Sequence, residues 1–456
     1  MAEFDFIFLV MPLEGDAIFY AALGEYFRRA GFNVGFITSS RVGDRIIREK
    51  GFEYYNIKDL IDYYNIKIDD ISKDCNLLES KYELNSIRDL VFPEKVYWKE
   101  KDPELMLKAI LYFYAIERFV TEHNIRCIVQ NDGAEILRRV VNKVAEKKSI
   151  PHIYIGFAPF PDRVALRPDE SFKWDDLALY NYRSLSEDEK NFIDDLIASF
   201  RKTKKSFSRL DERTTIFSVS PRIIIDDLYS YFFIEKRDYK MKEKYKNVFI
   251  RTIRKFLFKF IFKKPNLSEK YIYLPLHAPN DSQITVRAPQ FYRQEYLVEM
   301  VSRFLPQGYK LYVKPHPAAI YDYSLKMLRY CSKIENVVLL RPEVSSHDII
   351  ENSDTVIVVN STVGFESLFY FKPVIVLGES FYKGYGVTID VEYLYELRKA
   401  IKRALKNDVD TEKIKAFLFS AYKASWPGRF GDISPENLNI LTKSIINKLE
   451  KIEKNR

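Results

Sequence analysis

Short apolar runs alternate with amphipathic helical stretches along this chain, and that alternation limits the available folds more than any other feature. Residues 6–11 form a run of strand length that stops at Pro12. In the next stretch, EGDAIFYAALGEYFRRAGF, apolar pairs recur every four residues, which is helical spacing, and Gly31 is suited to end the helix. Residues 33–38, NVGFIT, return to a strand pattern. The opening therefore predicts a β–α–β unit with buried parallel strands.

The same alternation continues to about residue 156. Helical spacing predicts helices at 109–120 and 134–147, and short apolar runs predict strands at 127–130 and 152–156. The run GFAPFPDRVALRPDES that follows is rich in proline and polar residues, so we expect a loop there. A doubly wound domain of this kind binds ligands at the carboxyl ends of its strands.

A second alternating series begins after residue 270. Its apolar runs are YIYLPL, KLYVK, NVVLL, TVIVV and PVIVLG, and helices are expected at 293–304, 324–331, 346–352 and 363–370. Two such series in tandem predict the α/β fold class, with two Rossmann-like domains facing across a cleft, an architecture called GT-B. A single mixed α/β domain is the alternative.

Changes in composition indicate where these domains begin and end. We expect an N-terminal Rossmann-like domain on the acceptor side over 1–235, a basic linker over 236–270, a C-terminal Rossmann-like domain over 271–410 and a helical tail over 411–456. Length alone allows two or three domains, because the chain has 456 residues.

The linker contains RTIRKFLFKFIFKK, which mixes six basic and seven large apolar side chains with no acidic one. Several apolar residues fall on one helical face, whereas Phe258 and Phe262 interrupt the amphipathic pattern. Contact with an anionic membrane surface and burial against the core are both compatible with this segment, and we slightly favour the membrane surface.

Charge and cysteine content restrict the class of protein. The 72 basic and 64 acidic side chains give a net charge of +8, a modest excess that suits anionic ligands but does not indicate nucleic-acid binding. The three cysteines are widely spaced, which favours a reducing compartment and argues against a zinc site. The acidic N-terminus does not resemble a signal peptide, and no apolar run is long enough for a transmembrane helix. We therefore expect a cytoplasmic protein.

Polar residues follow three of the strands predicted in the second series. They are His277 and Asn280 in YLPLHAPNDSQ, Lys314 and His316 in KLYVKPHP, and Ser361, Thr362 and Glu366 in VVNSTVGFESL. In the last motif, hydroxyl side chains at the start of a helix can bind an anion together with free backbone N–H groups. Ordinary helix capping by Ser361 or Thr362 is the alternative.

Two prolines flank His316 and restrict its backbone at the end of a strand. Such rigidity favours a functional histidine, although a purely structural role is equally compatible with the motif alone. His277 ends an earlier strand of the same series, so both imidazoles could reach the same crevice.

These motifs, together with APQFYRQ and FYKGYG, resemble in order and spacing the capsular polysaccharide biosynthesis family of GT-B glycosyltransferases, which includes Kdo transferases. The resemblance is good over about residues 271–390 and weaker over 1–170. The His-Pro and Ser-Thr pairs are also similar to the motifs by which bacterial sialyltransferases hold cytidine monophosphate. The resemblance implies that His316, Ser361 and Thr362 contact the donor nucleotide and that Glu366 lies near its ribose. Related families often have glutamine where this chain has His277.

A catalytic carboxylate is expected in the N-terminal domain. QNDGAE follows a strand where bacterial sialyltransferases place an acidic pair before glycine, and here only Asp132 is acidic. Asp132 could act as a base or a nucleophile, or be merely a turn residue. Asp16 is the second candidate, with helix N-capping as its alternative role. The acidic pairs at 69–70 and 175–176 fit solvated faces better than a metal site, and the resemblance implies a reaction without metal or cofactor.

The sequence therefore predicts a glycosyltransferase of surface polysaccharide synthesis. Its expected partners are a nucleotide-sugar donor, with a cytidine nucleotide as the first candidate, and a glycan or lipid-linked acceptor. We expect no nucleic-acid partner, and peripheral attachment to the inner face of the membrane is a further expectation. Two alternatives remain open, a polyol phosphotransferase that uses a cytidine-diphosphate donor, as in teichoic-acid polymerases, and a non-catalytic protein that binds nucleotide sugars.

Overall fold

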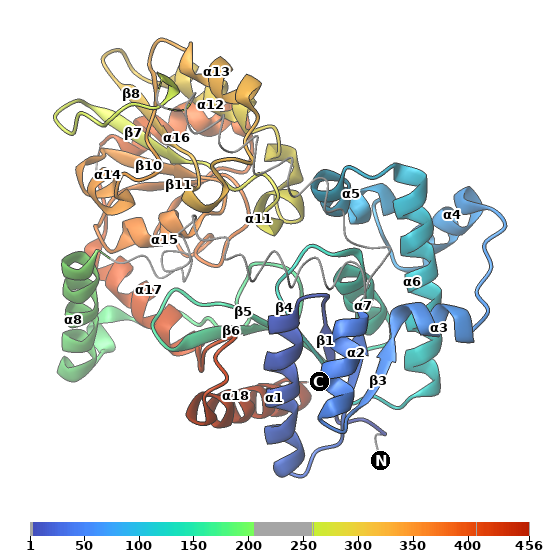
Figure 1. The fold of residues 1–456 in the computed structure, drawn as a ribbon. Helices are drawn as coiled ribbons and strands as arrows, with labels where there is room; N and C mark the ends of the chain where they lie inside the picture. Colours follow the sequence, from blue (N-terminus) through green and yellow to red (C-terminus); the bar gives the residue numbers. More distant parts are fainter. Residues whose placement is uncertain (1–2, 205–257, 259, 407, 456) are drawn as a thin grey trace, which may run out of the picture. The chain divides into compact units, whose positions relative to one another are not determined.

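The computed structural model describes residues 3–204, 258, 260–406 and 408–455, which form two compact units (Figure 1). The first unit comprises the described residues up to 176 and from 424 onward. The second comprises those from 177 to 423. Each unit is an α/β structure built on a largely parallel sheet, so the predicted fold class is confirmed. The arrangement of the two across a cleft stays a prediction.

The sheet of the first unit has the order β13-β6-β5-β4-β1-β2-β3 among the described residues. Strands β1 to β5 are parallel, whereas β6 and β13 run antiparallel to their neighbours. Every residue of the first two strands is buried, which explains why they are continuous apolar runs. The strands are β1 (Phe6–Val10), β2 (Val34–Thr38), β3 (Glu53–Asn56), β4 (Ile128–Asn131), β5 (His152–Phe157), β6 (Arg163–Arg167) and β13 (Trp426–Pro427).

Strand β6 corrects the expectation of a loop after residue 156. The loop from 158 to 162 forms a tight connection, with Asp162 in the left-handed conformation at φ 56°, and the chain then pairs back along β5. The prolines at positions 159 and 161 lie in this connection rather than in the strand. Strand β6 thereby brings Arg167 beside Tyr154 of β5, next to the end of β4.

The first unit contains eight α-helices within the described residues. They are α1 (Glu14–Arg29), α2 (Arg41–Glu49), α3 (Ile57–Tyr63), α4 (Ile71–Lys81), α5 (Ile87–Trp98), α6 (Asp102–Glu122), α7 (Ile136–Lys147) and α18 (Pro435–Lys454). Helix α18 lies beside α1 in Figure 1, and its Leu441 and Ile445 share a buried core with Phe19 of α1. The segment 411–456, expected as a helical tail, contains α17 (Thr411–Ala424) and α18 with the short strand β13 between them, and the two helices belong to different units.

The sheet of the second unit is parallel throughout, with the order β12-β11-β10-β7-β8-β9. Its strands are β7 (Tyr271–Pro275), β8 (Lys310–Lys314), β9 (Val337–Leu339), β10 (Thr355–Val358), β11 (Val374–Val376) and β12 (Ile389–Asp390). The α-helices of this unit in the described residues are α8 (Glu187–Thr203), α11 (Ser282–Thr285), α12 (Gln294–Phe304), α13 (Leu325–Ser332), α14 (Ser346–Asn352), α15 (Thr362–Leu368), α16 (Leu397–Ala404) and α17 (Thr411–Ala424). The second alternating series therefore folds as its pattern predicts.

Both sheets reverse their order of winding at one place. In the first sheet the chain adds β2 and β3 on one side of β1 and then crosses to β4 on the other side. In the second sheet it adds β8 and β9 beside β7 and then crosses to β10. Ligands of open α/β sheets bind outside the carboxyl ends of the strands at such a switch point. The fold thus marks the β1/β4 edge and the β7/β10 edge as places to look for a site.

Most of the basic linker segment lies outside the described residues. At its described end, Phe258 and Phe262 are only 7% and 4% exposed and belong to the core of the second unit, whereas Phe260 is 77% exposed. The two residues that interrupt the amphipathic pattern therefore face the core. Among the described residues, no helix is both long and apolar enough to cross a membrane.

Candidate active site

The three polar motifs of the second unit meet at one edge of its sheet. Strand β7 lies between β8 and β10, and all three run parallel. His277 follows β7, His316 follows β8, and Ser361 follows β10, so the three residues leave the carboxyl edge of adjacent strands. We call these residues, with Thr362, the strand-end cluster.

The backbones of the two histidines are joined by a buried tyrosine. The hydroxyl of Tyr323 accepts a hydrogen bond from His316 N at 2.9 Å and donates one to His277 O at 2.7 Å. The side-chain amide of Gln294 also holds His277, accepting from its N–H at 2.8 Å and donating to its carbonyl at 3.0 Å. Gln294 is the last residue of the APQFYRQ motif, but the sequence did not show that its side chain holds His277, 17 positions earlier. Tyr323 was not singled out, because its contact with the carbonyl of His277 spans 46 residues.

Burial keeps the ring of His277 neutral near pH 7. The side chain is 5% exposed, and burial lowers its pKa to about 4, although Asp281 acts in the opposite direction. His316 makes a smaller contribution in the same direction as burial. Asp281 itself begins the short helix α11, where its side chain accepts from Gln283 N at 2.9 Å.

Ser361 is the N-cap of α15, and its Oγ accepts from Val363 N at 3.3 Å. The capping role weighed against anion binding is thus present, and the Ser361 hydroxyl can still donate to a ligand. The hydroxyl of Tyr382 donates to Ser361 O at 2.5 Å. A side chain at Gly364 would place its Cβ 2.6 Å from that hydroxyl, so glycine is needed for the approach.

The other predicted donor-binding residues occupy different environments. Lys314 is buried at the end of β8 and donates to Ser346 Oγ at 2.9 Å. Glu366 is buried inside α15, so a ribose could reach its carboxylate only after local rearrangement. Asn280 is exposed in the turn before α11. The contacts predicted for these residues stay predictions.

Both carboxylate candidates of the first unit lie at the switch point of its sheet. Asp16 follows β1, and Asp132 follows β4, the neighbouring strand. Asp16 is not the N-cap of α1, since that position is Leu13. Its carboxylate accepts from Met11 N at 3.1 Å and lies 3.7 Å from Arg138 Nη2. Burial raises the pKa of Asp16, and Arg138 only partly opposes that effect.

Arg138 connects several of the polar groups at this edge. Its guanidinium donates to the Asn131 carbonyl at 2.8 Å and to the Asn131 side chain at 2.5 Å, and it pairs with Glu135 at 2.8 Å. The hydroxyl of Tyr20 donates to the same Asn131 side chain at 3.2 Å. Arg138 thereby fixes the loop that carries Asp132.

Asp132 forms an ion pair with Arg167, which is 1% exposed. The pair spans β5 at Gly156, where an added Cβ would lie 2.8 Å from Asp132 Oδ2 and 3.0 Å from Arg167 Nη2. The side chain of Asp132 remains 25% exposed, whereas that of Asp16 is 6% exposed. Asp132 is therefore the more accessible of the two carboxylates.

One expectation about acidic residues was wrong. Asp176 does not lie on a solvated face, because its buried carboxylate pairs with Lys448 at 2.8 Å and accepts from Trp426 Nε1 at 2.8 Å. Asp70 is the N-cap of α4 and accepts from Ser72 N at 2.9 Å. Within the described residues, no group of three or more histidine, cysteine or acidic side chains is placed to hold a metal ion.

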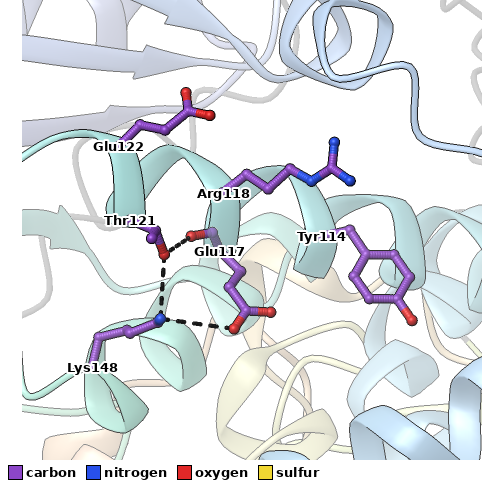
Figure 2. A pocket seen from close by; sticks show the side chains of 6 residues that line it. All are labelled: Tyr114, Glu117, Arg118, Thr121, Glu122 and Lys148. Atoms are coloured by element: carbon purple, nitrogen blue, oxygen red, sulfur yellow. Dashed lines mark hydrogen bonds and ion pairs between the residues drawn. The ribbon is translucent and has the colours of Figure 1, made fainter.

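A shallow hollow of about 370 Å³ lies elsewhere in the first unit (Figure 2). Lys148 donates across it to Thr121 Oγ1 at 3.2 Å and lies 3.9 Å from Glu117. Residues 121 and 148 precede strands β4 and β5, so the hollow is at the amino edge of the sheet, opposite Asp132. Its lining residues are Tyr114, Glu117, Arg118, Thr121, Glu122 and Lys148. The hollow is therefore separate from the candidate active site.

Comparison with known proteins identifies the family. The family model described as capsule polysaccharide biosynthesis protein matches residues 166–422, more than half of the chain. The chain belongs to this capsule polysaccharide biosynthesis family. The matched range contains the whole strand-end cluster and Arg167, but it includes neither Asp16 nor Asp132. The roles of those two carboxylates consequently depend on their geometry alone.

Two relatives match short parts of the chain. The capsule polysaccharide modification protein LipA of Neisseria meningitidis serogroup A is 29% identical over 133 residues, which are 28% of this chain and 18% of LipA. Protein FixF of Sinorhizobium fredii is 27% identical over 123 residues, 26% of this chain and 29% of FixF. The chain thus spans less than a third of the length of these relatives.

Solved structures match this chain at low similarity. The β-Kdo 2,4-transferase of Thermosulfurimonas dismutans KpsC is 15% identical with a TM-score of 0.38, over 72% of this chain and 87% of that one. The β-Kdo 2,7-transferase of the same KpsC is 16% identical with a TM-score of 0.36, over 75% and 95%.

Proposed function

We propose that this chain is a glycosyltransferase of capsular polysaccharide biosynthesis. It would transfer a sugar from a nucleotide donor, with a cytidine monophosphate sugar as the first candidate, to a glycan or lipid-linked acceptor. One observation carries the proposal. His316 follows β8 and the Ser361–Thr362 pair follows β10, the two strands that flank β7, and the sheet has its switch point between β7 and β10. Family membership supports it, because the matched range includes this edge.

The strand-end cluster suits the departure of a phosphate. When the bond between the anomeric carbon and the phosphate oxygen breaks, negative charge develops on the leaving nucleotide. Hydroxyl donors from Ser361 and Thr362, together with the imidazole of His316, could bind that charge without a metal ion. Buried Lys314 adds a positive charge close to the end of β8.

Asp132 is the proposed catalytic carboxylate. It could remove the proton from an acceptor hydroxyl while that oxygen bonds to the anomeric carbon, or it could attack that carbon first if configuration is retained. Arg167 orients the Asp132 carboxylate, and the exposed part of the Asp132 side chain is available to an acceptor. Asp16 is the second candidate, because burial raises its pKa and a carboxyl group of raised pKa suits proton transfer near neutral pH.

The location of the protein follows from the proposed chemistry. A nucleotide-sugar donor would be met in the cytoplasm, and a lipid-linked acceptor would be met at the inner face of the membrane. The basic segment over 251–264 is the candidate for contact with anionic lipid.

Titration calorimetry with CMP, UDP and GDP tests the choice of donor. We expect CMP to bind more tightly than the other two and His316→Ala to weaken CMP binding by at least tenfold, while the unfolding temperature of the nucleotide-free protein changes little. Equal CMP affinity in the two proteins would remove His316 from the site. Phosphate retained in the reaction product would instead identify transfer of a polyol phosphate.

A further inference from the structure

The side chain of Tyr323 continues the pairing of β7 and β8 beyond the end of their backbone ladder. The ladder between β7 and β8 includes the bond from Leu276 N to Lys314 O at 2.9 Å. One residue farther on, the Tyr323 hydroxyl bridges His316 N and His277 O, at 2.9 and 2.7 Å. The two strand ends are consequently held together past the point where the regular strands stop.

The neighbouring prolines increase the importance of this bridge. Because residues 315 and 317 are prolines and have no N–H, His316 has the only backbone donor between Lys314 and Ala318. That donor is bound by the hydroxyl of Tyr323. Tyr323 is itself fully buried, so water cannot readily replace its hydroxyl.

We propose that Tyr323 is a positioning residue, which holds the main chain of His316 against that of His277 so that the two imidazoles stay in place for the donor phosphate. The inference rests on the proposed function, since the phosphate is part of it. Without the hydroxyl, His316 N–H would lose its partner, and the segment between the prolines would be free to rotate away from β7. His277 would keep its two bonds to Gln294.

Tyr323→Phe tests the inference, and Tyr271→Phe is its matched control. Tyr271 is also fully buried in the second unit, and its hydroxyl donates to Ile349 O at 2.9 Å. It is the first residue of β7, however, at the opposite edge of the sheet from His277. Both variants lose a buried tyrosine hydroxyl, so circular dichroism should show a lowered unfolding temperature for each. We expect Tyr323→Phe to weaken CMP binding by about tenfold or more, because an unpaired donor loosens His316, and Tyr271→Phe to leave it unchanged.

The ring resonances of the five histidines give a second measurement that needs no nucleotide. In protein labelled with ¹³C-histidine, Tyr323→Phe should shift the signals of His316 and His277, whereas Tyr271→Phe should leave both in place. Unchanged signals in Tyr323→Phe would overturn the inference.

The two measurements separate failure of the inference from failure of the proposed function. Equal CMP affinity in wild type and Tyr323→Phe would refute the role of Tyr323 and leave the nucleotide site standing. Absence of CMP binding in the wild type would refute the cytidine donor, and the histidine signals would then decide the positioning role alone.

Discussion

Asp132 and Arg167 form an ion pair that crosses strand β5 at Gly156. Asp132 directly follows β4 and Arg167 ends β6, the strands on either side of β5. Both side chains approach position 156 so closely that a methyl group there would crowd them. An aspartate next to a sheet edge is common, but one held by an arginine that is 1% exposed has a fixed orientation. The pair therefore connects the packing of the first sheet to the carboxylate proposed for catalysis.

Gly156→Ala should separate this pair. The added methyl group would lie within 3.0 Å of both side chains, so each must move, and Arg167 would remain buried without its partner. We expect a loss of stability of about 1–3 kcal/mol and a clear loss of transferase activity. Tryptophan fluorescence can follow the unfolding, because all three tryptophans, Trp98, Trp174 and Trp426, belong to the first unit.

Gly15→Ala is the matched control for this change. Gly15 lies in the first turn of α1 beside Asp16, and an added Cβ there meets nothing within 4 Å. Alanine is also favoured over glycine inside a helix, so stability should stay equal or rise slightly. If Gly156→Ala behaves like Gly15→Ala in both measurements, the pair does not depend on the glycine.

The strands could be predicted where both faces are buried. Strands β7 and β10 are short continuous apolar runs for that reason, and the polar residues directly after them were recognisable as candidates for a site. Strand β6 escaped prediction because RVALR is bounded by arginines and lies between proline-rich segments. Arginine is mostly found at the surface, so the sequence pattern alone does not show that Arg167 is buried.

The supporting contacts of the site depend on residues far apart in the sequence. Tyr323 is 46 residues from the carbonyl of His277 that it binds, and Asp176 is 272 residues from its partner Lys448. No local periodicity records such pairings, so the sequence indicated the polar cluster but not the groups that hold it. No helix or strand was predicted between residues 41 and 98, although this region folds into β3 and helices α2 to α5.

Asp132→Asn should stop transfer while donor binding survives. The amide has the shape of the carboxylate but cannot accept the acceptor's proton, so kcat should fall by about 100-fold or more. CMP affinity should remain that of the wild type, because the strand-end cluster belongs to the second unit. Asp16→Asn provides the comparison, and a larger fall in kcat for that variant would make Asp16 the catalytic carboxylate.

Ser361→Ala should weaken the binding of phosphate specifically. Loss of the Ser361 hydroxyl removes one donor to the leaving group, so affinity for CMP should fall severalfold while affinity for cytidine, which has no phosphate, should not change. Titration calorimetry with the two ligands measures the difference. Ser345→Ala is a matched control, because Ser345 also caps a seven-residue helix, α14, and accepts from Asp348 N at 3.4 Å. Both variants should lose about 1 kcal/mol of stability through the lost cap. Equal effects on CMP and cytidine would show that Ser361 serves only as a cap.

His152 should make the first unit sensitive to acid. The side chain is 5% exposed, and burial lowers its pKa from 6.5 to about 3, so the imidazole stays neutral in the folded protein. Between those two values the unfolded chain binds one more proton than the folded one. Stability therefore falls as the pH decreases through this range, by about 1.4 kcal/mol for each pH unit.

His152→Phe isolates this contribution. The ring centroids of His152 and Tyr154 lie 4.7 Å apart. Neither nitrogen of the His152 ring has a hydrogen-bond partner among the described residues. Phenylalanine can therefore keep the packing without titrating. Urea unfolding followed by tryptophan fluorescence at pH 6.5, 5.5 and 4.5 should show the variant losing less stability than the wild type, with a difference of about 2–3 kcal/mol over that range. If the free energies of unfolding of wild type and His152→Phe fall in parallel with decreasing pH, His152 takes up a proton in the folded state near its ordinary pKa. Solvent would then have to reach the ring between β5 and the surrounding core.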